Sequence, residues 1–488
     1  MKTKLFTLVA LFSLYSVLKA QDVTVVDNVG GGDVYWTANN TYHLSGGVFV
    51  DAETTLHIEP GTVIKGMPGQ GEAASYLCVS RGGKIMAQGS SEAPIIFTFE
   101  ADPLDGSSSL TTRGQWGGLI VLGNAGLNST PGVSAIEGIP TTELRGQYGG
   151  SNDADNSGIL SFVSIRHGGI EIGAGNEING LTLAGVGYGT DVNNIEVIAN
   201  TDDGIEFFGG TVSVQYAFVS ACGDDSFDYD EGWRGQSNSH WVTVASADDG
   251  DRGGEHDGGT DPETAMPYAN PRIDSALFVG RGVDAGKRSL TFRDNAGGHY
   301  SNSIFYNFAK GVDIEDLEGA GEDSYSRFLN GDLSFTNNTV DCGSAVFVTS
   351  TGADLTDYFI ANGNTQSTNH GLSWSVEEVN MGGHANWAHW TLAMSSGWVI
   401  PGSEVSVDLP DDVNVRIYPN PLYGSSVRVA FDEYQTGSMS LTNSLGQLIY
   451  QRDFHGAENE ISAFTTKGLY FLKIEFSDGK SIIKTIVK

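Results

Sequence analysis

The chain has 488 residues, of which 66 are glycine and 39% are hydrophobic, and its formal net charge is −34. This composition excludes long helices with wide apolar stripes, and so acidic a chain is a poor partner for nucleic acid or for an anionic membrane surface. Abundant glycine favours many short strands joined by tight turns.

The N-terminal segment, residues 1–20, has the pattern of a secretory signal peptide. Two lysines precede an apolar run from Leu5 to Leu18, and a small residue, Ala20, precedes the expected cleavage point. No later stretch approaches the roughly 20 apolar residues that cross a bilayer, so the sequence predicts export without a transmembrane segment. Because export leads to an oxidising compartment, at most one disulfide is expected among three cysteines: Cys78, Cys222 and Cys342.

An internal repeat marks the middle of the chain. Residues 195–210 (IEVIANTDDGIEFFGG) align with residues 217–232 (AFVSACGDDSFDYDEG) at an offset of 22. The alignment superposes three acidic pairs: Asp202 on Asp224, Asp203 on Asp225, and Glu206 on Asp228. A similar apolar-acid-apolar triplet recurs in residues 169–172 and 311–314. An offset of this size predicts stacked structural units, with loops inserted between some of them.

Each triplet has the period of a strand, which predicts that Ile205 and Phe207 face inward and that Glu206 faces outward. Other segments alternate in the same way: residues 55–64, 119–124, 159–167 and 301–308. Many short strands in units of about 20 to 25 residues predict an all-β chain with a right-handed parallel β-helix over residues 21–400. An array of β-sandwiches is the alternative, but hairpin signals such as Asn-Gly between adjacent alternating runs are scarce.

The opening turns of this predicted solenoid can be compared with a known group. Residues 56–66 (LHIEPGTVIKG) and 77–99 (LCVSRGGKIMAQGSSEAPIIFTF) resemble the first turns of β-helix proteins that Bacteroidota secrete. The resemblance covers about three quarters of the chain. It implies an architecture and leaves the chemistry open, because β-helix folds carry lyases, hydrolases, adhesins and scaffolds alike.

The C-terminal part is distinct in charge and motif. A charged linker over residues 401–412 precedes residues 413–488, in which lysine and arginine slightly outnumber aspartate and glutamate. This part resembles the sorting domain of the type IX secretion system, a small β-sandwich. The matching positions are Tyr418, Pro419, Asn420, Pro421, Gly446, Gly468, Tyr470, Gly479 and Lys488. The resemblance implies passage through the translocon of that system, removal of this domain by its sortase, and then attachment to the outer surface or release.

One motif raises the question of catalysis. Residues 200–202 (Asn-Thr-Asp), followed 22 residues later by Asp224 and Asp225, are similar to the site of the polygalacturonase family of β-helix hydrolases. The resemblance implies an inverting enzyme with Asp225 as acid and Asp202 and Asp224 as bases, at carboxyl separations of roughly 6.5–9.5 Å. The family's Gly-His-Gly and its lysine do not follow, because residues 255–257 are Glu-His-Asp and Asp274 takes the place of the lysine.

The densest acidic region, residues 222–235 and 250–263, suggests binding. Asp224, Asp228 and Asp230 have the spacing of a calcium loop without the full helix-loop-helix pattern, so Ca²⁺ is a candidate cofactor and solvated turns are the alternative. The candidate ligand-contact residues around this region are Glu206, Trp233, Arg234 and His256.

Four tryptophans near the end of the predicted solenoid indicate a capping element, with sugar stacking as the alternative: Trp374, Trp387, Trp390 and Trp398. Together these patterns predict a secreted or surface-attached β-helix protein that binds extracellular polysaccharide or serves as an adhesin or scaffold. The alternative function is a polysaccharide-cleaving hydrolase or lyase that uses the stacked aspartates.

Overall fold

The computed structural model describes residues 21–173, 176–245, 249–259, 262–319, 321–367, 390–395, 415–418, 426–443, 448–464, 469–477 and 481–487. The predicted signal peptide and linker lie outside the described residues. So do seven positions of the predicted sorting motif: Pro419, Asn420, Pro421, Gly446, Gly468, Gly479 and Lys488.

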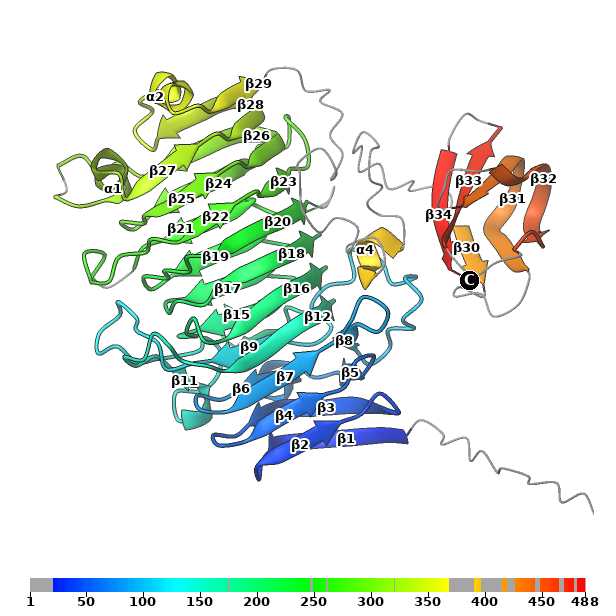
Figure 1. Ribbon diagram of the computed structural model, residues 1–488, viewed down its shortest axis with the longest axis horizontal. Helices are drawn as coiled ribbons and strands as arrows, with labels where there is room; N and C mark the ends of the chain where they lie inside the picture. The colour runs from blue at the N-terminus through cyan, green and yellow to red at the C-terminus, as the bar shows by residue number, and fades with distance from the viewer. Residues whose placement is uncertain are drawn as a thin grey trace, which may run out of the picture.

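Twenty-five strands pair into one system that winds as a solenoid (Figure 1). Its strands pair in parallel with the equivalent strands of the coils before and after, as between β17 (Ile205–Phe208) and β19 (Phe227–Asp230). Each coil contributes strands to three faces, which we call A, B and C. The predicted parallel β-helix is therefore confirmed.

Face A runs through the length of the solenoid. It contains the second half of β3 (Asn40–Val50), then β6 (Tyr76–Val79), β9 (Leu119–Leu122), β15 (Leu181–Ala184), β17, β19, β21 (Gly254–Asp257), β24 (Arg288–Arg293) and the second halves of β26 (Ile304–Ile314) and β28 (Thr339–Thr349).

Face B contains strands that follow face A in each coil. They are β2 (Asp33–Trp36), β4 (Thr55–Ile58), β7 (Lys84–Gln88), the first halves of β12 (Gly158–Arg166), β16 (Asp191–Ile198), β18 (Val214–Ser220) and β20 (Asn238–Val244), and then β22 (Arg272–Asp274), β25 (Gly298–Ser301) and β27 (Leu333–Thr336).

Face C closes each coil. It contains β1 (Gln21–Val29), the first half of β3 (Asn40–Val50), β5 (Val63–Gly66), β8 (Ile95–Phe99), the second halves of β12, β16, β18 and β20, then β23 (Leu277–Val279), the first halves of β26 (Ile304–Ile314) and β28 (Thr339–Thr349), and β29 (Thr365–Ser367).

The bend between faces B and C is made by a single residue with positive φ. In seven coils this residue is not glycine: Phe162, Asn194, Tyr216, His240, Ser275, Asn302 and Asn337. A left-handed backbone is costly for most side chains, so stacking between coils must hold it in place. The rings of Tyr216 and His240, for example, stack at 4.7 Å.

The core is built from the inward residues of the three faces. Ile205 and Phe207 are fully buried, and Phe227 and Tyr229 lie directly over them in the next coil. This confirms the predicted alternation. Burying large apolar side chains along the whole axis supplies the main stabilisation of such a fold, because no coil can bury its inner side alone.

An outer layer covers the early part of face A. It carries the short strands β10 (Ser134–Ala135) and β11 (Gln147–Tyr148), the 3-10 helix η2 (Leu144–Gly146), and the hairpin of β13 (Glu171–Gly173) and β14 (Asn176–Glu177). Its apolar side chains pack on outward residues of face A such as Cys78 and Ile120. The triplet at residues 169–172 was predicted to be a coil strand, and this is wrong, because it belongs to the outer layer.

Two short helices lie near the far end of the solenoid. Phe328 of α1 (Ser324–Asn330) and Phe359 of α2 (Thr356–Ala361) both pack against Phe347. Trp390 instead packs on Phe162 beside face C, next to α4 (Leu392–Ser395). The predicted capping role is therefore corrected for Trp390, and the other three tryptophans of the expected cap and its neighbourhood lie outside the described residues.

The C-terminal part forms an antiparallel sheet of five strands: β30 (Val415–Tyr418), β31 (Val427–Asn443), β32 (Leu448–Ile461), β33 (Leu469–Phe476) and β34 (Ser481–Val487). All five strands contribute to one apolar core. Tyr470 is buried there, and Tyr418 pairs with Arg428. This confirms the predicted all-β module.

Two further expectations concern the whole chain. No helix of the described residues is long and apolar enough to cross a membrane. Cys78, Cys222 and Cys342 are all buried free thiols, so the one disulfide that the sequence allowed is not formed.

Candidate functional site

The acidic repeat stacks in the register that the sequence predicts. Glu206 of β17 lies directly over Asp228 of β19, which lies over Glu255 of β21. Two coils farther on, Asp313 of the triplet at residues 311–314 stands in the same column, after Thr291. Neighbouring strands are ~4.8 Å apart, so these carboxylates form an outward ladder on face A.

A second column stands at the corner where each coil enters face A. The backbone N–H of Asp225 donates to Oδ1 of Asp203 at 2.8 Å, and the backbone N–H of Arg252 donates to Oδ1 of Asp225 at 2.5 Å. Asp203 is 6% exposed and Asp225 is 1% exposed. Each aspartate therefore satisfies a buried backbone donor of the next coil, which is a structural role.

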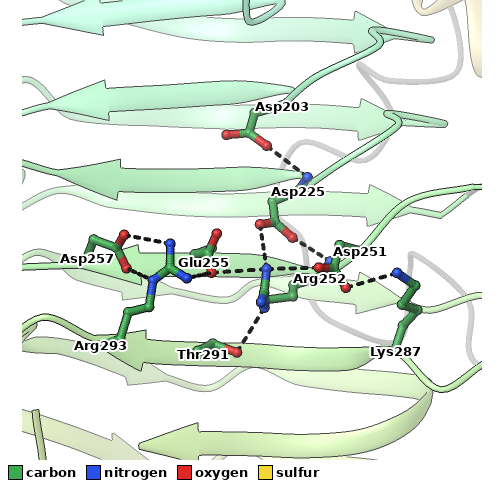
Figure 2. Close-up of polar contacts among 9 residues, drawn as sticks. All are labelled: Asp203, Asp225, Asp251, Arg252, Glu255, Asp257, Lys287, Thr291 and Arg293. Atoms are coloured by element: carbon green, nitrogen blue, oxygen red, sulfur yellow. Dashed lines mark hydrogen bonds and ion pairs between the residues drawn. The ribbon is translucent and has the colours of Figure 1, made fainter. Parts of the chain in front are cut away.

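Arginine and lysine compensate the later part of the ladder (Figure 2). Nη1 of Arg252 lies 3.0 Å from Glu255 and 3.0 Å from Asp251, and its Nε donates to Thr291. Arg293 contacts Glu255 at 3.0 Å and Asp257 at 2.7 Å, while Lys287 approaches Asp251 at 3.2 Å. Face A is thus a mixed-charge network from Asp225 onward.

The earlier part of the ladder is acidic without such compensation among the described residues. One oxygen each of Asp203, Glu206 and Asp228 lie within 4.8 Å of one another. Asn179 Nδ2 donates to Glu206. Burial, and next the repulsion between these carboxylates, raises the pKa of Asp203, Glu206 and Asp228 well above the ordinary range.

Of the three predicted catalytic aspartates, Asp224 lies close both to Asp202 and to Asp225. Oxygens of Asp202, Asp203 and Asp224 lie within 4.8 Å, as do those of Asp224, Asp225 and Asp251. Asp224 is therefore closer to Asp225 than the roughly 6.5–9.5 Å that leaves room for a water between an acid and a base. Asp224 is exposed, whereas Asp225, the predicted acid, is buried and bound to Arg252.

Two of the predicted ligand-contact residues belong to the core, which corrects the sequence interpretation. Trp233 is fully buried, stacks on Phe207 at 3.9 Å, and donates its indole N–H to the carbonyl of Val212. His256 is fully buried and bonded to the hydroxyl of Tyr300. Burial lowers the pKa of His256 to about 3, so its ring is neutral in the folded protein.

The other two predicted ligand-contact residues have protein partners. Arg234 lies past the opposite end of β19 from Asp224, and its Nη2 pairs with Asp153 at 3.1 Å. Glu206 belongs to the set with Asp203 and Asp228. Of the predicted metal ligands, only Asp228 lies in that set; Asp224 belongs to the neighbouring aspartate sets, and Asp230 stands two residues along β19, outside every carboxylate cluster of the described residues.

A groove on face B was missed from the sequence. Its volume is about 450 Å³, and its lining is mostly hydroxyl and amide side chains from five strands: Gln215, Gln236, Ser237, Asn238, Ser239, Arg272, Asp274, His299, Ser301, Ser334 and Thr336, over Ile273 and Tyr300. Its residues are 24 to 35 positions apart along neighbouring strands. Polar residues at outward positions in residues 213–215, 237–239 and 299–301 could have indicated this groove, but the sequence interpretation concentrated on the acidic motifs.

Two family models match the chain, one over the solenoid and one over the C-terminal part. Residues 28–394 match the family model described as a pectate-lyase-like β-helix domain, and residues 416–488 match the model described as a secretion system C-terminal sorting domain. A search of curated proteins gave no match.

Among solved structures, the chain is similar to tailspike protein 2 of bacteriophage CBA120, in its enzymatically active domain and at full length. The active domain shows 9% identity and a TM-score of 0.26, with coverage of 92% of this chain and 72% of the other. The full-length protein, from an Escherichia coli O157:H7 bacteriophage, shows 10% identity and a TM-score of 0.22, with coverage of 92% and 64%.

Proposed function

Since the chain belongs to the pectate-lyase-like β-helix family and carries a sorting domain for export to the cell surface or beyond, we propose that it binds extracellular glycan in the groove of face B without cleaving it. The observation that carries this proposal is that several polar groups in the groove have no partner among the described residues.

Several of these groups are available to a ligand. Within the described residues, the hydroxyls of Ser239 and Thr336 have no protein partner, and the exposed Arg272 bonds only through Nε, to Gln236 at 3.1 Å. His299 uses Nδ1 for Ser334 at 2.7 Å, which leaves Nε2 for a ligand. Glycans present hydroxyl groups that both donate and accept, so such a surface suits them.

The spacing of the groove favours a chain that runs along the solenoid axis. Gln215, Ser239, Asp274, Ser301 and Thr336 form one column across five coils. Successive members are ~4.8 Å apart, and this repeat offers one hydrogen-bonding group per coil to an extended polymer.

Charge in the groove favours a neutral glycan. The carboxylate of Asp274 is fixed by Ser301 at 2.7 Å, Asn302 at 2.6 Å and Ser275 at 2.7 Å. Burial acts to raise the pKa of Asp274, but these hydrogen bonds hold that pKa below its ordinary value. The carboxylate therefore stays ionised. With one fixed anion beside Arg272, the groove has no net preference for an anionic polymer.

The rival function is cleavage of polysaccharide at Asp202, Asp224 and Asp225. The burial of Asp225 and its bonds to Arg252 weigh against a proton donor there. Asp224, however, is exposed and lies beside Asp202, so a polysaccharide can reach it, and the cleavage hypothesis is tested at this residue.

The test is retention of the purified protein on a panel of immobilised neutral and acidic polysaccharides, with assays for reducing ends and unsaturated sugars. We expect retention on a neutral member, loss of retention in Arg272→Ala and in His299→Ala, and no loss in Lys310→Ala, which removes an exposed cation outside the groove. The proposal would be overturned if Arg272→Ala and His299→Ala were retained as well as Lys310→Ala, or if the wild type released cleavage products.

A further inference from the structure

The polar column of the groove continues beyond the groove toward the N-terminal end of face B. It begins at Gln88 of β7, passes through Ser161 and Asn193, and reaches the groove at Gln215. From there it runs through the groove to Thr336. Every member of this column is polar. The surface that offers one hydrogen-bonding side chain per coil therefore starts three coils before the groove.

A second outward column of face B starts with an aromatic pair. The rings of Tyr35 on β2 and His57 on β4 stack, with centroids 4.6 Å apart and an interplanar angle of 9°. Nε2 of His57 lies 2.8 Å from Oδ1 of Asp33, which fixes the imidazole. Met86 and Ile159 follow in the next two coils. We call the four outward side chains of this column the platform: Tyr35, His57, Met86 and Ile159.

The ring of Tyr35 is available to a ligand. It is 63% exposed, although its stacking on His57 holds it in one position. A side chain that is already fixed loses little conformational entropy when a ligand packs on it. A sugar ring has an apolar face of C–H groups, which suits an aromatic ring, and a rim of hydroxyls, which suits amides. The exposed amide of Gln88 has no protein partner among the described residues.

Face B carries exposed side chains along its whole length, and its strands lie one beside the next from β2 to β27 (Figure 1). Its exposed outward residues are Tyr35, Gln88, Asp191, Gln215, Arg272 and Thr336. Among the described residues, the other two faces are more closed. The outer layer covers Cys78 and Ile120 on face A, and Ile198 and Val242 on face C are buried. Face B is therefore the face that suits a long ligand.

We infer that the platform is a second contact point for the glycan that the groove binds, so that the ligand is a linear polysaccharide that follows face B from Thr336 to Tyr35. The inference rests on the proposed glycan binding and adds to it the length of the ligand and an apolar contact at its far end.

The dimensions of face B set the length of that ligand. Its ten strands from β2 to β27 span nine spacings, or about 43 Å, whereas the five strands of the groove span about 19 Å. One sugar unit of an extended chain is about as long as one strand spacing, so about four units fill the groove and about nine reach the platform.

The experiment compares fragments of one polysaccharide. The neutral polysaccharide that retains the wild type is cut into fragments of defined length, and calorimetry measures the affinity of the purified protein for each fragment. The affinity is expected to rise past about four units and to level at about nine. Tyr35→Ala should weaken the binding of long fragments about tenfold. It should leave the binding of the shortest fragments unchanged, because these occupy the groove alone.

Two variants serve as controls. Tyr35→Phe keeps the ring and should bind long fragments as the wild type does. Leu144→Ala removes a side chain that is 70% exposed in the outer layer of face A, and it should also bind as the wild type does. An equal loss of affinity in Leu144→Ala and Tyr35→Ala would mean that exposed apolar side chains contribute without a defined site, and it would overturn the inference.

The failure of this inference is distinct from the failure of the proposed function. If the affinity levels at about four units, or if Tyr35→Ala binds long fragments as the wild type does, the platform is not a contact and the groove remains the binding site. If the wild type binds no polysaccharide, both proposals are overturned. If Tyr35→Ala unfolds the first coil, the dependence of affinity on fragment length decides alone.

Discussion

Arg252 and Asp225 are joined twice, through the backbone N–H of Arg252 to Oδ1 at 2.5 Å and through its Nη1 to Oδ2 at 3.2 Å. Asp225→Ala should destabilise the protein by about 1–3 kcal/mol, because it leaves the buried backbone N–H of Arg252 without its acceptor, while the guanidinium keeps Asp251 and Glu255. Asp225→Asn should cost less, since the amide oxygen still accepts from the backbone. Urea unfolding measures both, and an unchanged stability of Asp225→Ala would show that the corner column is not structural.

Trp233 offers a test of the corrected core assignment. Its indole packs between Phe207 and Tyr229 and is fully buried, so Trp233→Ala should cost about 3–5 kcal/mol in unfolding free energy. The neighbouring Arg234→Ala should cost no more than about 1 kcal/mol, since its pair with Asp153 lies at the surface. A stable Trp233→Ala protein that fails to bind glycan would restore Trp233 as a ligand contact.

Glu231 gives the protein a pH dependence of known sign. Burial raises the pKa of Glu231 to about 7, against a counteracting hydrogen bond from Tyr148. The unfolded carboxyl ionises near pH 4.5 while the folded one keeps its proton, so stability falls as the pH rises from about 4.5 to 7 and then levels. Glu231→Gln should remove this loss, which amounts at most to roughly 3 kcal/mol or a little more.

Denaturation of wild type and Glu231→Gln at pH 5 and at pH 8 checks this prediction. The two proteins should differ little at pH 5, and the variant should be the more stable at pH 8. Parallel pH profiles would mean that Glu231 is already ionised in the folded state.

A protein that lacks the sorting domain should not be exported across the outer membrane. Removal of residues 413–488 should leave the β-helix folded but retained inside the outer membrane, because the secretion machinery handles that domain. Cell fractionation followed by immunoblotting measures the distribution. Truncated protein in the medium at the wild-type level would show that export does not depend on this domain.

The sequence was sufficient to predict features that recur at equivalent positions of successive coils. The offset of 22 placed Glu206 over Asp228, and the alternation identified Ile205 and Phe207 as core residues. The burial of His256 could also have been predicted by extending the repeat by one coil. If Glu255 is aligned with Asp228, His256 aligns with the inward-facing Tyr229, as the structure shows.

Other features depend on contacts that no local pattern carries. The bend residues between faces B and C, such as Phe162 and His240, are not glycines and give no turn signal. Trp233 lies in a turn outside the alternation. The groove of face B needs the outward residues of five coils, and the insertion of variable loops between those coils hides their common register.

The most direct test of the account compares three proteins on a neutral polysaccharide that retains the wild type: the wild type, Arg272→Ala and Asp224→Asn. The account predicts that Arg272→Ala elutes with the unbound fraction, that Asp224→Asn is retained as the wild type is, and that none of them releases reducing ends. Retention of Arg272→Ala, together with product formation that Asp224→Asn abolishes, would contradict it and assign the protein to the cleaving enzymes.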